Sequence, residues 1–428
     1  MNVLVIGLGS AGDVHPMAGL ALALRRRGHH ARLAAWAGFE SLARRTGVEF
    51  IGLGTEQDYR EAIQDPDLWH PYRAFGAVCR RLILPLMRPV YEIAARHSES
   101  EAAVVAAPAT AFGARLAGEK LGVPLVTVHL QPSLLRSVYE APCYGFPDVP
   151  GHLPRPLRRL YFRAVDRFLI DRLLAAELNQ FRAELGLPPV RRLFDRWCHS
   201  ERLVIGFFPE WFGPPQPDWP PNVHLAGFPL FDESGSREPS AELMEFLDLG
   251  PAPVVFMAGS ANAQAREFFR VSVEACRAGG WRGILLTGFP DLLPGRLGER
   301  IRHFDYIPLS EVLPRASVVV HHGGIGTTAQ AFAAGTPQLV VPNTHDQPDN
   351  AARVRRLGAG RLLLPRQYTA SAVVRHVRSL LDSPAVRQNC RKRAVDLAGS
   401  SALDRACLLI ERLAGPEKRP VRAPPAAG

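Results

Sequence analysis

The chain has 428 residues, of which 47% are hydrophobic and 21% charged, a composition typical of a soluble globular protein with room for two domains. Its six cysteines are far apart and form no CxxC pair, so the sequence shows no pattern of a zinc site or of a disulfide framework. Such cysteine usage fits a protein of a reducing compartment. No apolar run approaches the roughly 20 residues that span a bilayer, and no basic segment precedes the first apolar run. We therefore expect a cytoplasmic protein without a signal peptide.

The net charge of +10 is concentrated near the end of the chain, where residues 353–428 hold 16 Lys or Arg and 5 Asp or Glu. Such a charge can indicate nucleic-acid binding. The basic residues here lack the interleaved aromatic residues of a single-strand groove, so we expect no nucleic-acid partner. The charge favours peripheral attraction to the anionic inner face of the plasma membrane, and solubility alone is the simpler alternative.

The first half of the chain alternates between short apolar runs and amphipathic segments. The alternation predicts strands at 2–7, 31–35, 48–52, 103–107 and 124–128, and helices at 16–27, 39–46 and 110–121. Strands that alternate with helices form a parallel, doubly wound sheet. Insertions at 58–96 and 154–185 mix arginine with long apolar side chains. The apolar stripe of the second insertion suits core packing, the wall of a substrate pocket, or a membrane surface.

A second alternation follows a proline- and aromatic-rich segment at 207–229. It predicts helices at 241–247, 266–278, 310–313, 369–381 and 385–398, and strands at 254–257, 283–287, 302–306, 317–320 and 338–341. The fold class is therefore α/β, with two Rossmann-like domains facing across a crevice. We predict the domain limits as 1–231, linker 232–240, 241–398, a helix at 399–415 packing back on the first domain, and a disordered tail at 416–428.

The most informative stretch runs from residue 317 to residue 350. Its strand ends in a glycine turn that opens a helix; the residues concerned are His322, Gly323, Gly324, Gly326 and Thr327. Unpaired amides and the positive end of the helix dipole make such a turn a phosphate site, and the His322 ring can donate to the same anion. Asp346 and Gln347 follow the next strand and suit a ligand with hydroxyl groups. The pattern predicts a nucleotide sugar, and a glycine turn without a ligand is the alternative.

Three further residues stand where a nucleotide would bind. Ser260 follows the strand at 254–257 and can donate its hydroxyl and its amide to a phosphate. Tyr306 and Ile307 end the strand before the glycine turn, where an aromatic ring and a free backbone edge suit a nucleobase.

The loop Gly7–Gly12 matches GxGxxG, which alone indicates dinucleotide binding. The second strand, however, ends without a carboxylate for a ribose, and Asp13 at the helix start would repel a pyrophosphate. Asp13 can instead act as a general base toward a substrate hydroxyl, kept ionised by the helix N-terminus, or simply cap the helix. His15 is the second candidate base. His129 ends the strand at 124–128 and faces the expected crevice as a ligand or as a wall residue.

These residues resemble the nucleotide-sugar glycosyltransferases of the GT-B fold. HHGGIGTT at 321–328, followed by VVPNTHDQ at 340–347, is similar to the donor-binding signature of that family, and GSAGDVHP at 9–16 is similar to its acceptor-side loop. Segments 65–76, 207–220 and 227–232 resemble the rhamnosyltransferases of rhamnolipid synthesis. The likeness extends over residues 2–413.

The resemblance implies a metal-independent, inverting enzyme of the hexosyltransferase type, with no cofactor beyond its donor. A hexosyl or deoxyhexosyl group, rhamnosyl favoured, would pass from a dTDP- or UDP-sugar to a hydroxyl of an acceptor. The apolar insertions favour a lipid or polyketide-like acceptor. Asp13 would be the base, and Gly12 and His129 would lie on the acceptor side.

The resemblance also assigns the donor site. The diphosphate would contact His322, the backbone of 323–328 and Ser260; the base would contact Tyr306 and Ile307; the sugar would contact Asp346 and Gln347. Many relatives place Glu on the ribose where this chain has Gln330, which leaves the nucleotide open. Two other hypotheses remain: a nicotinamide- or flavin-dependent oxidoreductase using the Gly7–Gly12 loop, and a non-catalytic nucleotide-sugar-binding protein of the same fold.

Overall fold

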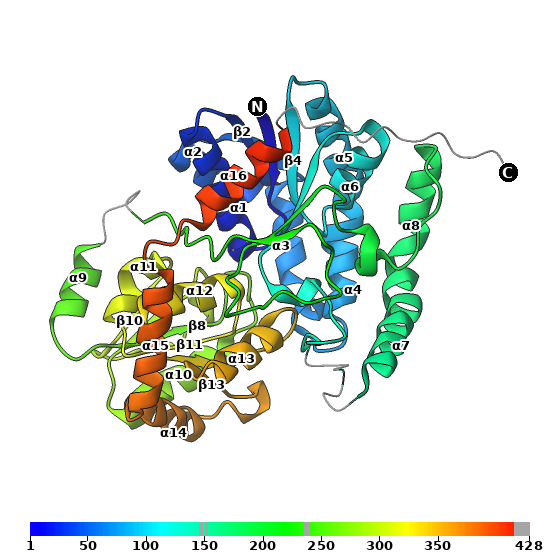
Figure 1. Ribbon diagram of the computed structural model, residues 1–428. Coiled ribbons are helices and arrows are strands. Elements are labelled where there is room, and N and C mark those ends of the chain that lie inside the picture. The colour runs from blue at the N-terminus through cyan, green and yellow to red at the C-terminus, as the bar shows by residue number, and fades with distance from the viewer. Residues whose placement is uncertain (145–148, 150–152, 235–239, 415–428) are drawn as a thin grey trace.

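All strands pair in parallel and form two sheets, in the computed structural model shown in Figure 1, which describes residues 1–144, 149, 153–234 and 240–414. Residues 235–239 of the expected linker and the expected tail lie outside the described residues. The first sheet has the order β3-β2-β1-β4-β5-β6-β7. Its strands are β1 (Asn2–Ile6), β2 (His30–Trp36), β3 (Glu49–Leu53), β4 (Ala103–Pro108), β5 (Leu125–His129), β6 (Leu203–Gly206) and β7 (Val223–Leu225).

The second sheet has the order β10-β9-β8-β11-β12-β13. Its strands are β8 (Val254–Met257), β9 (Gly283–Leu286), β10 (Ile301–Phe304), β11 (Val318–His321), β12 (Gln338–Val340) and β13 (Gly360–Leu362). The strand order reverses between β1 and β4 in the first sheet and between β8 and β11 in the second. Ligands of open α/β sheets bind at such points. Both glycine loops of the sequence lie there, one after β1 and one after β11.

Helices cover both sheets, and the alternation predicted from the sequence is confirmed. In the first domain they are α1 (Ala11–Arg26), α2 (Glu40–Thr46), α3 (Glu56–Gln64), α4 (Ala74–Val78), α5 (Leu84–Ser98), α6 (Phe112–Leu121), α7 (Arg155–Val165) and α8 (Asp171–Glu184). In the second they are α9 (Ala241–Asp248), α10 (Arg266–Gly279), α11 (Leu309–Val312), α12 (Ile325–Ala334), α13 (Gln347–Arg356), α14 (Ala370–Leu381) and α15 (Pro384–Leu397), followed by α16 (Ala402–Ala414). The second insertion is two helices joined by a π-helical turn at Asp166–Ile170.

Several predicted boundaries were wrong. Helix α1 begins at Ala11 rather than at Pro16, because Ser10 and Asp13 form a capping box ahead of the proline. Helix α13 was not predicted, since Pro348 and its polar neighbours resemble a turn; a proline in the first helical turn is instead a common helix start. Strands β6, β7 and β13 were missed.

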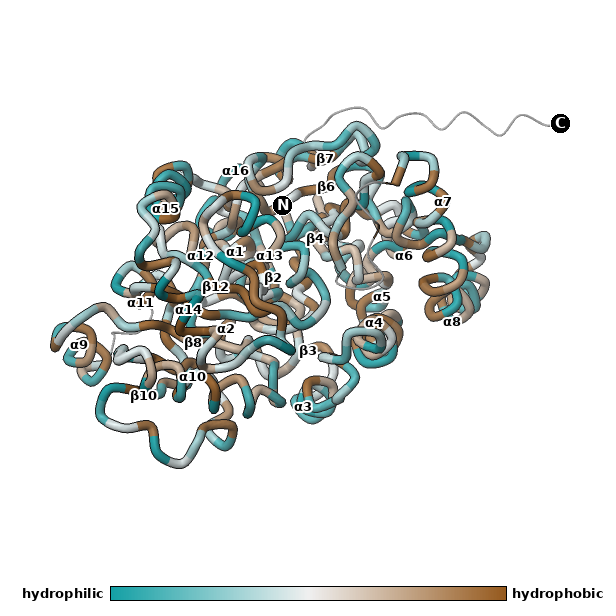
Figure 2. The backbone as a smooth tube through the Cα atoms, turned by 90° about the horizontal axis from the view of Figure 1, so that it is seen from below, coloured by the Kyte–Doolittle hydropathy of each residue, from teal (hydrophilic) through white to brown (hydrophobic). Residues whose placement is uncertain are grey.

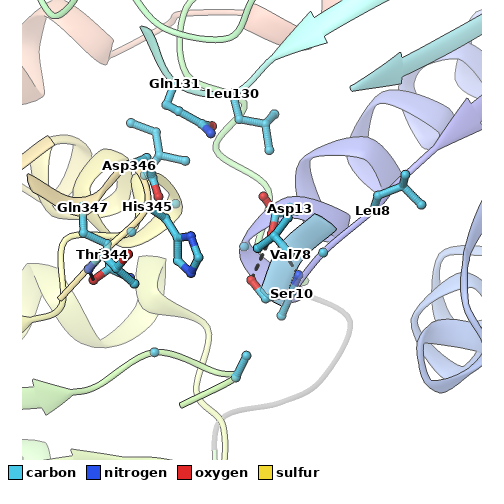
Figure 3. A pocket seen from close by; sticks show the side chains of 18 of the residues that line it. Leu8, Ser10, Asp13, Val78, Leu130, Gln131, Thr344, His345, Asp346 and Gln347 are labelled. Atoms are coloured by element: carbon cyan, nitrogen blue, oxygen red, sulfur yellow. Dashed lines mark hydrogen bonds between the residues drawn. The ribbon is translucent and has the colours of Figure 1, made fainter. Parts of the chain in front are cut away.

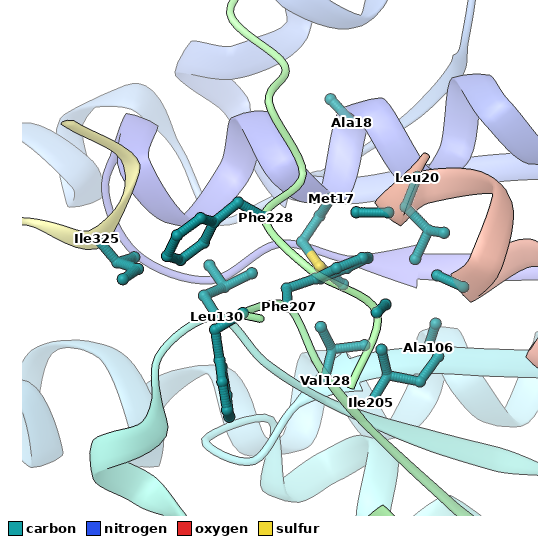
Figure 4. Close-up of a cluster of buried hydrophobic side chains, with 14 of the residues drawn as sticks. Met17, Ala18, Leu20, Ala106, Val128, Leu130, Ile205, Phe207, Phe228 and Ile325 are labelled. Carbon is teal, nitrogen blue, oxygen red and sulfur yellow. The ribbon is translucent and has the colours of Figure 1, made fainter. Parts of the chain in front are cut away.

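One hydrophobic cluster crosses from the first domain to the second. In Figure 4, Leu130 and Phe228 of the first domain lie close to Ile325, the first residue of α12. Phe332, farther along α12, meets Trp211 with ring centroids 5.1 Å apart. The aromatic segment at 207–229 therefore packs the donor-side helix against the first domain, which fixes how the two sheets face each other.

Helix α16 returns to the first domain and packs against α1 (Figure 1). Arg27, the C-cap residue of α1, makes two hydrogen bonds to Glu411, of 2.7 and 2.8 Å, and Arg405 donates to the carbonyl of Ala226 at 2.7 Å. The chain thus crosses between the domains twice. Within the part of the chain that the structure describes, no helix combines the length and the apolar character needed to cross a bilayer.

Candidate active site

A cavity of about 1090 Å³ lies between the carboxyl ends of the two sheets. Both domains contribute to its wall, and Figure 3 shows part of it. The residues singled out in the sequence that line this cavity are Gly12, Asp13, His15, His129, Ser260, Tyr306, Ile307, His322, Gly324, Gly326, Thr327, Gln330, Asp346 and Gln347. The fold therefore brings candidate residues from six separate segments of the chain to one place.

Gly323 is the exception, because it does not line the cavity. Its amide donates to Nδ1 of His321 at 3.1 Å, so that amide is not available to a phosphate. Its φ of +94° suits glycine, and a Cβ there would lie 2.8 Å from the Val340 side chain. Gly323 turns the chain; the amides that can hold an anion begin at Gly324.

Helix α12 presents its N-terminus to the cavity. Gly324 is its N-cap residue, and the first backbone bond of the helix runs from the amide of Thr328 to the carbonyl of Gly324. The amides of Gly324, Gly326 and Thr327 therefore have no partner within the helix, and the helix dipole adds positive potential at the same point. The geometry suits the anion that is expected at this point from the sequence.

His322 packs beside this helix start. A Cβ at Gly324 would lie 2.4 Å from Nε2 of the ring, and a Cβ at Gly259 would lie 3.1 Å from it, so both glycines are needed to admit the imidazole. The buried Nδ1 has no hydrogen-bond partner among the described residues. Burial lowers the pKa of His322 to about 4, so the ring is neutral when the site is empty.

Asp13 lies at the N-terminus of α1 and points into the cavity (Figure 3). Its carboxylate accepts hydrogen bonds from the amide of Ser10 at 2.8 Å and from the Ser10 hydroxyl at 3.1 Å. Burial raises the pKa of Asp13, and the two bonds from Ser10 lower it by less. Desolvation, rather than the helix start named in the sequence analysis, is therefore the largest influence on the pKa of Asp13.

Two glycines allow this arrangement. Gly9 has a φ of +125°, and a Cβ there would lie 2.3 Å from the Asp13 carboxylate. A Cβ at Gly326 would lie 3.9 Å from the Cα of Gly12, which shows how closely the starts of α1 and α12 approach each other. The candidate base of one domain thus lies beside the anion site of the other.

Asp346 is the N-cap residue of α13 and faces the same cavity. Burial raises the pKa of Asp346 to about 7, with a further contribution from the charge of Asp13. Asn350 donates to Asp346 at 2.7 Å and to the carbonyl of Gly323 at 2.9 Å, which ties the carboxylate to the glycine turn. Oε1 of Gln347 accepts from the amide of Asn343 at 2.9 Å, so the amide group of its side chain is left for a ligand.

His345 was not singled out in the sequence. It lies between Asp346 and Asp13 in Figure 3 and has a φ of +62°, which is unusual outside glycine. Nε2 lies 3.0 Å from the carbonyl oxygen of Leu68 in the first domain. A carbonyl only accepts, so Nε2 carries the proton; burial lowers the pKa of His345 to about 4, and Nδ1 is left as an acceptor. The signal that could have found His345 is its position directly before Asp346.

His15 lies on the side of the cavity that Tyr306 lines. Its Nε2 is 3.6 Å from the carboxylate of Glu233, and its ring meets that of Tyr306 edge-on at 6.3 Å. Tyr306 in turn donates to the carbonyl of Asp232 at 2.7 Å. Burial lowers the pKa of His15. Since Asp13 interacts with the charge of Asp346 while His15 faces Tyr306, Asp13 is the better placed of the two candidate bases.

His129 ends β5 in the wall of the cavity. Its Nε2 lies 3.1 Å from Nδ1 of His199, and its own buried Nδ1 has no partner among the described residues. Burial holds the pKa of His129 well below the usual value, so the ring is neutral. A neutral ring with one unbonded nitrogen can exchange a hydrogen bond with a substrate hydroxyl.

The cavity extends from these polar groups into an apolar compartment formed by the two insertions. Its side chains come from α4, α7 and α8 and from the π-helical turns at Cys79–Ile83, Asp166–Ile170 and Leu193–Trp197: Phe75, Val78, Leu82, Ile83, Tyr161, Phe162, Val165, Leu169, Ile170, Leu173 and Phe194. The sequence left open whether the apolar stripe of the second insertion packs in the core, lines a pocket or faces a membrane. In the structure, one face of this insertion lines the cavity. Across the described ranges, no group of three or more His, Cys, Asp or Glu side chains is arranged to hold a metal ion.

Two facing doubly wound domains with the ligand crevice between them define the GT-B architecture. The glycosyltransferase family 28 N-terminal domain matches residues 3–140, and the C-terminal domain of erythromycin biosynthesis protein CIII-like proteins matches residues 290–402. The chain belongs to the nucleotide-sugar glycosyltransferases of the GT-B fold, and it is an enzyme of the hexosyltransferase type.

Relatives match over the whole length of the chain. O-mycaminosyltylonolide 6-deoxyallosyltransferase of Streptomyces fradiae is 33% identical, with 97% of this chain and 98% of the relative covered. The crystal structure of the glycotransferase of kitacinnamycin shares the fold with a TM-score of 0.75 at 20% identity, covering 97% of this chain and 99% of that one. Glycosyltransferase VinC in complex with dTDP gives a TM-score of 0.68 at 18% identity, covering 97% and 99%. The oxidoreductase hypothesis for the Gly7–Gly12 loop is therefore not retained.

Proposed function

We propose that the protein transfers a deoxyhexosyl group, rhamnosyl favoured, from a dTDP- or UDP-sugar to a hydroxyl of an apolar acceptor, with inversion at the anomeric carbon. The observation that carries this proposal is the placement of the Asp13 carboxylate opposite the N-terminus of α12 and beside Asp346. A base on one wall and an anion site on the other suit a displacement between them.

Asp13 removes the proton of the acceptor hydroxyl as its oxygen forms a bond to the anomeric carbon. The bond from that carbon to the diphosphate oxygen breaks, and its electron pair leaves with the nucleoside diphosphate. The raised pKa of Asp13 makes the carboxylate a stronger base than an exposed aspartate would be. The bonds from Ser10 hold the carboxylate in position.

The leaving diphosphate is stabilised at the start of α12. The amides of Gly324, Gly326 and Thr327 point to it, and Ser260 follows β8 on the neighbouring strand end. The neutral His322 ring can donate one ring N–H to a diphosphate oxygen as negative charge develops on the leaving group. Charge stabilisation of this kind needs no metal ion.

The donor is assigned by its chemistry. The Tyr306 ring is 47% exposed and lines the cavity, where a nucleobase can stack. Gln330 is buried along the same wall and can bond ribose hydroxyls. Asp346 and Gln347 hold the sugar hydroxyls. A dTDP-sugar is favoured over a UDP-sugar because VinC was solved with dTDP and the S. fradiae relative is named for a 6-deoxysugar.

The acceptor is assigned by the apolar compartment. Aromatic and branched side chains of the two insertions surround a space that suits a lipid or a polyketide-like ring, and the S. fradiae relative is named for a tylonolide acceptor. His129 and the backbone at Gly12 lie where the acceptor hydroxyl would approach Asp13.

Thermal shifts of the purified protein with dTDP, UDP, GDP and NAD test the donor class. A ligand at about 100 times its dissociation constant stabilises the folded state by roughly 2.7 kcal/mol. We expect stabilisation by dTDP, weaker stabilisation by UDP and none by NAD. Stabilisation by NAD alone would overturn the proposal. Binding of dTDP without transfer to any hydroxylated apolar acceptor, and without donor hydrolysis, would instead favour a non-catalytic nucleotide-sugar-binding protein.

A further inference from the structure

Helix α7 and the π-helical turn that follows it present two stripes to solvent on the side away from the cavity. Leu157, Leu160 and Phe168 form an apolar stripe, and their side chains are 48%, 62% and 69% exposed. Arginines at 155, 159, 163 and 167 recur every four residues and form the second stripe beside it. We call this combined surface the α7 face. Exposed large apolar side chains that gather on one helix mark an interaction site rather than ordinary surface.

The arginine stripe has no carboxylate partner among the described residues. The two acids of the same segment are engaged elsewhere: Asp166 is buried and pairs with Arg136 at 2.8 Å, and Asp171 accepts the amide of Arg192 at 2.9 Å. Like charges four residues apart destabilise a helix. An anionic partner that is not among the described residues would therefore stabilise the arginine stripe.

We propose that the α7 face docks on an anionic lipid bilayer. A helix with arginines on one stripe and Leu and Phe on the next lies in the plane of a membrane interface, with its apolar side chains among the acyl chains. Tyr139, which is 39% exposed and stacks under Arg155 at 4.2 Å, adds an interfacial aromatic ring at one end of the face. Helices α7 and α8 form one edge of the molecule in Figure 1, and the tube there alternates between hydrophilic and hydrophobic in Figure 2.

The α7 face lies on the same helix that lines the apolar compartment of the cavity, which suggests a role for membrane docking. Tyr161, Phe162 and Val165 of the same helix line the apolar compartment of the cavity. A docked helix would therefore have lipid on one side and the acceptor compartment on the other, so an apolar acceptor could pass from the bilayer to Asp13 without crossing bulk water. This step rests on the proposed function; the docking itself does not.

Flotation of the full chain with vesicles tests the inference. We expect binding to vesicles of phosphatidylglycerol and phosphatidylcholine, little binding to phosphatidylcholine alone, and weaker binding at high salt. Arg159→Glu with Arg163→Glu should weaken the partition at least about 30-fold. Leu160→Ser with Phe168→Ser should weaken it roughly 10-fold or more.

Matched controls distinguish binding through the α7 face from nonspecific effects of net charge and of exposed apolar side chains. Arg391→Glu with Lys392→Glu makes the same change of charge on the exposed side of α15, and Leu249→Ser with Val395→Ser removes two side chains that are 71% and 73% exposed. Both control proteins should bind vesicles like the wild type. The basic C-terminal region, not α7, would be the membrane contact if the α15 reversal abolished binding, and the inference would then be wrong.

Two further results would also overturn the inference. One is absence of vesicle binding by the wild type; the other is a stable dimer in sedimentation that the α7 variants dissociate while vesicle binding is unchanged. The dTDP thermal shift is measured on every variant to show that each is folded. The same measurement separates the two proposals. A variant that no longer binds vesicles but still binds dTDP leaves the glycosyltransferase proposal intact. A protein that binds vesicles but not dTDP leaves the docking proposal intact.

Discussion

The charge of Asp13 raises the pKa of Asp346, although the two carboxylates belong to different domains. Burial is the larger cause, and together they bring the pKa of Asp346 to about 7. The crevice thus holds two acids that are not both fully ionised near neutral pH. A protonated Asp346 can donate to a sugar oxygen as well as accept from a hydroxyl, which widens the range of sugar positions that it can recognise.

Asp346→Asn should remove a pH dependence of stability. In the wild type the unfolded chain loses this proton near pH 4 and the folded protein keeps it to about pH 7, so the free energy of unfolding falls as pH rises through this window. The slope is at most about 1.4 kcal/mol per pH unit. Asparagine still accepts from Asn350 but does not titrate. Urea unfolding at about pH 5 and about pH 8 measures the difference, and an unchanged slope in the variant would contradict the assignment.

Asp13→Asn should reduce transfer by roughly 10²- to 10⁴-fold and leave dTDP affinity unchanged, because the amide keeps the shape but not the basicity of the carboxylate. Asp58→Asn is the matched control. Asp58 accepts from the amide and hydroxyl of Thr55, both at 2.7 Å, as Asp13 does from Ser10, but it caps α3 outside the cavity. Steady-state rates for both variants separate capping from catalysis, and full activity of Asp13→Asn would remove this residue from the mechanism.

Gly9→Ala should lower kcat, because the substitution would move the Asp13 carboxylate. The added Cβ would lie 2.3 Å from the carboxylate and would displace it. Gly28→Ala introduces the same kind of strain, at a φ of +85°, with no atom within 4 Å of the new Cβ. We expect roughly a 10²-fold loss of kcat for Gly9→Ala and a loss of thermal stability alone for Gly28→Ala. Equal kinetics in the two variants would show that the position of Asp13 does not limit the reaction.

Much of the fold could be predicted because hydrophobic periodicity and the glycines that end helices or form turns are local properties of the sequence. The strand ending at His321, the turn after it and the helix capped by Gly335 follow from residues within a few positions of each other. Strand β13 could not be predicted, since its three residues include a glycine and an arginine and it is held in the sheet by pairing with β12.

The candidate site shows a similar division. The residues that sequence reasoning placed at strand ends do line one cavity, because parallel strands bring their carboxyl ends to one edge. Sequence could not show that the amide of Gly323 is taken by His321, or that His345 reaches Leu68 of the other domain. Those contacts depend on side-chain direction and on the packing of the two domains, and neither has a periodic signature.

His322→Ala should weaken dTDP binding by roughly 10-fold, which is the value of a hydrogen bond to a charged group. Because the pKa of the empty ring is about 4, we expect dTDP affinity to change little between about pH 6 and about pH 8 in the wild type, apart from the titration of the phosphate itself. Calorimetry of dTDP binding measures both effects. Unchanged affinity in the variant would show that the ring does not contact the diphosphate.

His345→Asn tests whether the bond between His345 and Leu68 closes the sugar site. Asparagine tolerates a positive φ, so the backbone at this position can keep its conformation while the bond across the domains is lost. We expect dTDP affinity to stay the same, the KM for the dTDP-sugar to rise roughly 5- to 10-fold, and donor hydrolysis to increase relative to transfer as water enters. His345→Ala adds backbone strain to the same loss, so it should show these kinetics with a lower melting temperature. If both variants transferred the sugar with wild-type KM and no added hydrolysis, the contact would be structural only, and the sugar would be held by Asp346 and Gln347 without help from the first domain.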